Sequence, residues 1–129
     1  MCRSLLFLLA LTLPAYGEEP LSGAAFEAFA TGKTLSYAVG GTVYGAEQYL
    51  PGRQVIWAFR GQECRKGLWY EEGGQICFVY EDEPGAQCWT FSRDGDRLQA
   101  RFSGDAEGAE PVQMQESTPL TCAGPDLGV

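Results

Sequence analysis

The chain of 129 residues contains no histidine and, as the printed sequence shows, no asparagine. Without histidine it lacks the commonest general base and the commonest metal ligand among the side chains. Without asparagine it has no N-glycosylation sequon, so nothing indicates a eukaryotic secretory route. The Cys-x-x-Cys pairs of zinc and redox sites are missing as well. We therefore expect no catalytic residue, no metal site and no cofactor.

Basic residues are scarce, with 9 Lys and Arg against 17 Asp and Glu and a net charge of −8. Nucleic acids and anionic membrane surfaces select proteins with basic patches. We therefore expect no nucleic-acid partner and no attachment to an anionic membrane. The acidic surface is typical of a domain whose charge keeps it in solution.

Long apolar runs are missing except at the N-terminus, where Arg3 precedes a run from Leu5 to Leu13. Ala15-Tyr16-Gly17 then places small residues where a signal peptidase cleaves. The run is far shorter than the roughly 20 residues of a membrane-spanning helix. The sequence predicts a signal peptide over residues 1–17 and one exported, monomeric domain over residues 18–129, with no membrane insertion after cleavage.

Four cysteines remain after that cleavage, and an even number in an exported chain predicts two disulfides. If Glu81–Pro84 connects two strands, Cys77 lies directly opposite Cys88, at bonding distance. Cys64 then bonds Cys122 by elimination. A one-residue change in that register leaves two alternatives open, in which Cys64 pairs with Cys77 or with Cys88.

Turn signals recur at regular intervals through the middle of the chain, which predicts an antiparallel meander of about seven strands. A short helix is expected before it over residues 21–30, capped by Ser22 and with Phe26 and Phe29 on one face. Residues 104–129 are rich in Gly, Pro and acidic residues and are expected to be loop and tail. The expected strands are residues 33–39, 42–50, 53–60, 63–72, 75–80, 86–93 and 96–103.

Both faces of this sheet are apolar in part if the turns contain two residues, so that Arg60 faces Glu63 and Phe91 faces Leu98. A flat single sheet cannot bury both faces. We therefore expect a mainly β fold with a strongly bent sheet or partial barrel, and a tail pinned by a disulfide. A bulge near Gly67, or a cover formed by the helix and tail, is the alternative.

Aromatic residues are concentrated on the central strands, where they could line a ligand pocket or form a binding face. Ordinary core packing is the alternative, since aromatic residues favour strands. The candidate binding residues are Trp57, Trp69, Tyr80 and Trp89. Of these, Trp69 and Tyr80 lie near strand ends and are expected to be the more exposed.

A series of short motifs resembles a family of small uncharacterised exported proteins from alphaproteobacteria. The resemblance covers most of the chain after residue 17 and implies a periplasmic setting, but no activity and no site. The motifs are Tyr49-Leu50-Pro51-Gly52-Arg53, Trp57, Cys64, Gly67-Leu68-Trp69-Tyr70, Ile76-Cys77-Phe78 and Gln87-Cys88-Trp89.

Three functions follow from these observations, in order. The first is a non-enzymatic, inhibitor-like module that binds a protein partner or envelope component, which predicts an exposed aromatic patch. The second is a carrier of a small apolar ligand in an aromatic-lined, calycin-like cavity of roughly 300 Å³ or more. The third is a hydrolase that uses the carboxylates of Glu71-Glu72 or Glu81-Asp82-Glu83, which predicts two acidic groups in one cleft, one with a raised pKa.

Overall fold

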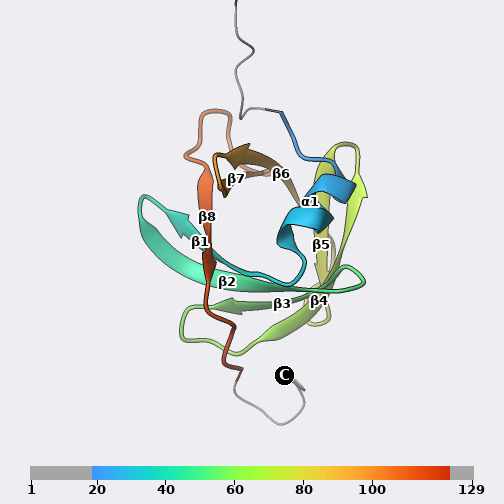
Figure 1. The fold of residues 1–129 in the computed structure, drawn as a ribbon, viewed down its shortest axis with the longest axis vertical. Coiled ribbons are helices and arrows are strands. Elements are labelled where there is room, and N and C mark those ends of the chain that lie inside the picture. Colours follow the sequence, from blue (N-terminus) through green and yellow to red (C-terminus); the bar gives the residue numbers. More distant parts are fainter. Residues whose placement is uncertain (1–18, 123–129) are drawn as a thin grey trace, which may run out of the picture.

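A computed structural model describes residues 19–122, which form one helix followed by a closed barrel of antiparallel strands (Figure 1). Each strand pairs with the next along the chain, and the last pairs with the first. The elements are α1 (Gly23–Ala30), β1 (Thr34–Val39), β2 (Thr42–Leu50), β3 (Gln54–Phe59), β4 (Arg65–Glu72), β5 (Gln75–Tyr80), β6 (Gln87–Asp94), β7 (Arg97–Phe102) and β8 (Val112–Ser117).

The predicted signal peptide over residues 1–17 lies outside the described residues and stays a prediction. Within residues 19–122, no helix has the length and apolar character that a membrane crossing requires.

The seven expected strands are all present, but the partial barrel is wrong because an eighth strand closes the sheet. β8 was expected to be part of a loop and tail. It alternates buried Val112 and Met114 with exposed glutamines, and it pairs with β7 on one side and β1 on the other. The alternation puts its two apolar side chains into the core and leaves no free sheet edge.

The pairing of β3 with β4 explains why both faces of the sheet look apolar in the sequence. Gln54 lies opposite Leu68, one residue away from the register that would place Arg60 opposite Glu63. A slip of one residue turns every side chain of a strand to the other face. Trp69 therefore points into the barrel and is 3% exposed, whereas Leu68 points outward and is 56% exposed.

Both predicted disulfides are confirmed. Cys77 and Cys88 face each other on β5 and β6 and are bonded. Cys64, just before β4, is bonded to Cys122, so the segment that follows β8 is fixed against the barrel.

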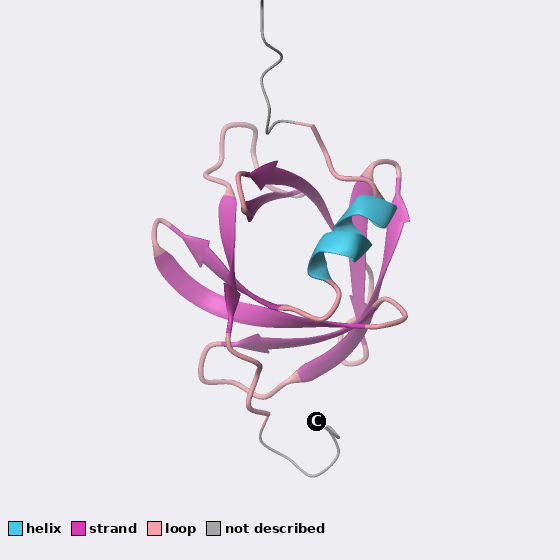
Figure 2. Ribbon diagram, in the orientation of Figure 1, coloured by secondary structure: helices cyan, strands magenta, loops and turns pink. Residues whose placement is uncertain are grey.

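α1 closes one end of the barrel, which we call the closed end (Figure 2). Ser22 caps the helix as predicted, because its hydroxyl accepts a hydrogen bond from the Ala25 amide at 3.1 Å. The chain is tied to the strands on both sides of the helix. The Leu21 amide donates to the Phe91 carbonyl at 2.7 Å, and the Gly32 amide donates to the Tyr49 carbonyl at 2.8 Å.

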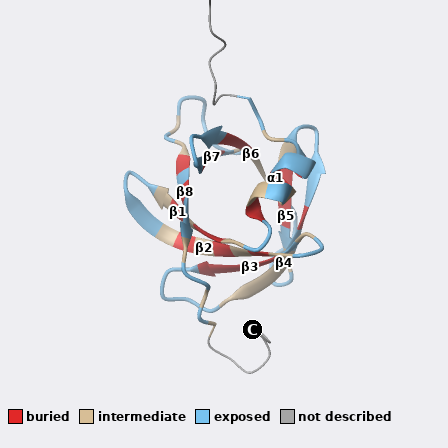
Figure 3. Cartoon of the chain, viewed as in Figure 1, coloured by how far each residue is buried: buried red, intermediate tan, exposed pale blue. Residues whose placement is uncertain are grey.

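Phe26 is the part of α1 that fills the barrel, and it is fully buried. Its ring lies 5.4 Å from Tyr49, 5.1 Å from Trp69 and 4.5 Å from Phe91, measured between centroids. In Figure 3 the buried segments accordingly run along the strands and the inner side of α1. The hydrophobic core therefore occupies the closed end, and the opposite end, which we call the mouth, has no such plug.

Candidate functional site

The mouth of the barrel contains a cavity of about 530 Å³, and every strand contributes at least one residue to its wall. The wall residues are Tyr37, Val39, Tyr44, Glu47, Trp57, Phe59, Arg65, Phe78, Tyr80, Glu83, Gln87, Trp89, Phe102, Asp105 and Val112. Two other hollows, of about 560 and 790 Å³, lie over the outer face of β3–β5 and beside α1. Only the mouth cavity is lined from inside the barrel by aromatic rings.

A β-bulge in β2 brings Tyr44 to the cavity wall. The pairing of β2 with β1 shifts by one residue between Val43 and Gly45, so Tyr44 is the extra residue of the strand. Its ring lies 6.0 Å from that of Trp57. Gly45 makes room for that indole, since a Cβ there would lie 2.5 Å from the Trp57 ring. A glycine inside a strand is the sequence signal that could have predicted this bulge.

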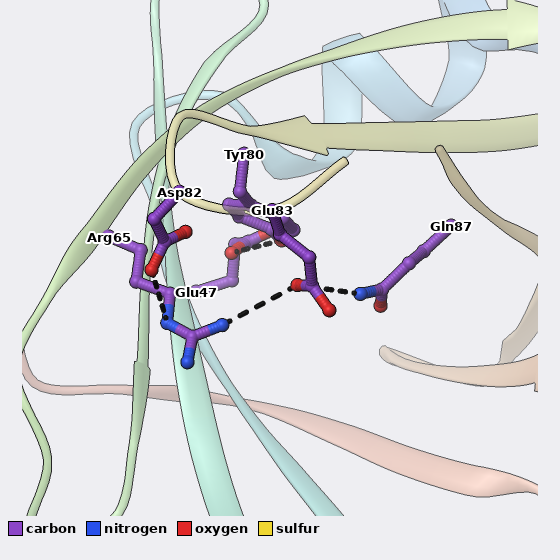
Figure 4. Close-up of polar contacts among 6 residues, drawn as sticks. All are labelled: Glu47, Arg65, Tyr80, Asp82, Glu83 and Gln87. Carbon is purple, nitrogen blue, oxygen red and sulfur yellow. Dashed lines mark hydrogen bonds and ion pairs between the residues drawn. The ribbon is translucent and has the colours of Figure 1, made fainter. Parts of the chain in front are cut away.

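Glu47 is the buried polar group of the cavity and is only 1% exposed. The Tyr80 hydroxyl lies 2.9 Å and 3.0 Å from its two carboxylate oxygens (Figure 4). Burial raises the pKa of Glu47 to about 8, while the hydrogen bond from Tyr80 acts to lower it. The carboxyl group is therefore mainly protonated at neutral pH.

Two further phenols lie next to Glu47. The hydroxyl groups of Tyr37 and Tyr49 are hydrogen-bonded to each other in the interior. Burial raises the pKa of both phenols well above the ordinary value, so both stay neutral over the physiological range. Tyr37 also forms part of the aromatic wall, with its ring 5.1 Å from Trp57 and 6.5 Å from Trp89.

Charged groups surround the opening of the cavity. Arg65 at the start of β4 lies 3.3 Å from Asp82 and 3.5 Å from Glu83, and Gln87 donates to Glu83 at 3.2 Å (Figure 4). The Arg65 guanidinium also lies 5.4 Å from the centre of the Phe59 ring. The one basic residue of the wall is therefore already paired with acidic groups.

The structure brings together three of the four aromatic residues predicted for binding. Trp57, Tyr80 and Trp89 line the mouth cavity. Trp69 does not, because it packs on Phe26 at the closed end with the Arg53 guanidinium 4.5 Å above its ring. The expectation that Trp69 is exposed is wrong, and the one-residue slip between β3 and β4 is the reason.

Sequence reasoning missed Glu47, which is one of 17 acidic residues and belongs to no motif. Its signal is positional, since it stands between Gly45 and Tyr49 on the buried face of a strand. Within residues 19–122, no group of three or more Cys, Asp and Glu side chains is placed to hold a metal ion.

Replacing Tyr80 with phenylalanine should raise the pKa of Glu47 further, by about one to two units. The substitution removes the hydroxyl that stabilises the ionised carboxylate, and a hydrogen bond to a charged group contributes about 1.5–3 kcal/mol. The measurement is the pH titration of the Glu47 carboxyl carbon by NMR. Tyr70→Phe on the outer face is the control and should leave the pKa unchanged; an unchanged pKa in Tyr80→Phe would contradict the expectation.

Compared with known proteins, the chain matches no family model, no curated protein and no solved structure.

Proposed function

We propose that the protein is a non-enzymatic binding module that holds a small, largely apolar molecule in the mouth cavity, in the manner of a carrier of calycin-like shape. The observation that carries this proposal is a cavity of about 530 Å³ walled by all eight strands. Ligand pockets have volumes of about 300–1,000 Å³, and a barrel of this size can hold one small ligand.

The chemistry of the wall supports the same proposal. Most of the wall is aromatic or aliphatic, and its polar groups are few and fixed: Glu47 with Tyr80 inside, and Arg65, Gln87 and the acidic loops at the opening. Apolar walls with a few placed polar groups are typical of sites for small molecules. The carrier hypothesis, ranked second from the sequence, therefore moves ahead of the other two.

A protein-binding module, ranked first from the sequence, has weaker support. It would use exposed aromatic surface, yet Trp57 and Trp69 are 8% and 3% exposed. The apolar side chains that do face outward on β4 and β5 are mainly the aliphatic Leu68 and Val79, which lie opposite each other.

A carboxylate hydrolase stays third. It would need two carboxyl groups on either side of the scissile bond, one of them with a raised pKa. Glu47 has such a pKa, and Glu83 lines the same cavity. Glu83 is engaged at the opening by Arg65 and Gln87, however, which is typical of a structural ion pair.

The proposed setting is the periplasm of a Gram-negative bacterium. The predicted signal peptide and the resemblance to exported alphaproteobacterial proteins support it. Two disulfides are also what an oxidising compartment permits.

Titration with N-phenyl-1-naphthylamine, a neutral apolar fluorophore, tests the proposal. We expect saturable binding at one site, with a rise in probe fluorescence and a change in tryptophan emission. Trp89→Ala, in the cavity wall, should weaken binding at least tenfold, and Leu68→Ala on the outer face should not. Absence of saturable binding, or its loss in Leu68→Ala alone, would contradict the proposal; circular dichroism checks that each variant is folded.

A further inference from the structure

The aromatic wall of the mouth has the geometry of a cage around Tyr37. The ring of Tyr37 lies 5.1 Å from Trp57 at an interplanar angle of 88°, and 6.3 Å from Tyr44 at 64°. Trp89 approaches the same ring from β6 at 6.5 Å and 70°. Rings set at steep angles turn faces as well as edges toward the space between them, and ring faces attract cations.

The charge around the cavity has one dominant sign. Three carboxyl groups line it, those of Glu47, Glu83 and Asp105, against the single guanidinium of Arg65. Arg65 is held by Asp82 and Glu83, so it offers little to an incoming anion. A cleft lined mainly by acidic groups concentrates cations and repels anions.

The protein itself already places a cation on an aromatic ring of this wall. The Arg65 guanidinium lies over Phe59 at 5.4 Å from its centroid. This contact shows that a ring of the wall is accessible to a cationic group from the opening.

Glu47 lacks the donors that an ionised carboxylate needs. Its two oxygens share the one hydroxyl of Tyr80, although a carboxylate has about four acceptor sites. Burial therefore raises its pKa to about 8 and keeps it protonated at neutral pH. A cation in the cavity would supply the missing countercharge, so Glu47 would release its proton to solvent as the cation binds.

From these four observations we infer that the ligand of the mouth cavity is an organic cation, an ammonium group on an apolar body, with the ammonium between the cage of Tyr37, Trp57 and Trp89 and the carboxyl group of Glu47. This inference rests on the proposed function and names its ligand class. It requires that binding and the ionisation of Glu47 are coupled.

The groups that face Glu47 define the pH range in which this coupling is visible. The phenols of Tyr37, Tyr44, Tyr49 and Tyr80 all have raised pKa values, so they stay protonated between pH 6 and 8. The charged groups at the opening are Arg65, Glu83 and Asp105. Binding of a cation should therefore tighten by up to tenfold per pH unit below about pH 8 and level off above it.

Two probes of the same shape test the inference by displacement of N-phenyl-1-naphthylamine. Benzyltrimethylammonium carries the charge, and neopentylbenzene replaces its nitrogen with carbon. At pH 8 the cation should bind at least tenfold more tightly than the neutral probe, and calorimetry in two buffers at pH 7 should show proton release. The affinity of the neutral probe should not rise with pH.

Variants locate the effect. Glu47→Gln should abolish the pH dependence and weaken the cation about tenfold, with the neutral probe unaffected. Glu116→Gln, the same change on an exposed residue of β8, should leave both probes unchanged. If the fluorophore binds but the neutral probe matches or exceeds the cation, the ligand class is wrong and the proposed function stands. If nothing binds, including the fluorophore, the proposed function itself fails.

Discussion

Phe26→Ala should lower the free energy of unfolding by about 3–5 kcal/mol, the range measured when a buried phenylalanine is truncated. Phe26 is fully buried and its ring contacts the rings of Tyr49, Trp69 and Phe91. Those residues belong to three strands, so the space left by the ring cannot close by the movement of one element. The measurement is equilibrium unfolding in urea with both disulfides oxidised.

Phe29→Ala provides the control, because Phe29 is on the same helix but only partly buried. Its ring contacts the Lys33 ammonium at 3.9 Å and the Arg93 guanidinium at 5.2 Å, both near the surface. Such exposed contacts contribute about 0.5–1 kcal/mol each, so the loss should be a third or less of that for Phe26. Equal losses for the two variants would show that α1 packs on the barrel without plugging it.

Local turn chemistry accounts for the strands that the sequence could predict. Gly73 and Gly74 have φ values of 56° and 77°, as a two-residue hairpin requires, and Glu72 pairs with Gln75 directly across them. The predicted pairing of Cys77 with Cys88 depended in the same way on one short connection.

Where the connection is longer, the prediction fails by one residue. Gly61 has a positive φ as a turn glycine should, but β3 ends at Phe59 and β4 begins only at Arg65. Cys64 lies in the intervening loop, bonded to Cys122, instead of entering the sheet. That long-range bond is not encoded in the local pattern, and through it the orientation of Trp69 was missed.

Barrel closure and Glu47 were missed for a related reason. The alternation of β8 is short and surrounded by Gly, Pro and acidic residues, and only pairing with distant β1 and β7 gives it a place. Glu47 faces the cavity because of the register of β2, which a single carboxylate in the sequence cannot reveal. The aromatic residues were identifiable by type, whereas the polar group among them required the fold.

The stability of the protein should fall as the pH rises from about 5 to 8, because Glu47 is protonated in the folded state. Its pKa is about 8 when folded and about 4.5 when exposed, so between these values the folded state binds one more proton than the unfolded state. Stability then decreases with pH by up to about 1.4 kcal/mol per unit. The contribution is complete below about pH 4.5 and is lost as the pH passes through 8.

Glu47→Gln isolates this contribution, because glutamine keeps the shape and the hydrogen bond with Tyr80 but cannot ionise. At pH 8 the variant should be more stable than the natural protein by about 3–5 kcal/mol, and near pH 4.5 the two should be similar. The measurement is the midpoint and free energy of urea unfolding at half-unit pH steps. Glu116→Gln, which changes an exposed carboxylate, should follow the natural protein throughout.

The difference between the natural protein and Glu47→Gln is the informative curve, since other carboxylates titrate equally in both. A difference that is flat from pH 5 to 8 would mean that Glu47 ionises freely in the folded state. In that case Glu47 could not release a proton when a cation binds, and the proton release expected in calorimetry at pH 7 should also be missing. A difference that grows toward pH 8, together with tighter cation binding over the same range, would show that one buried carboxyl group destabilises the empty barrel and recognises its ligand.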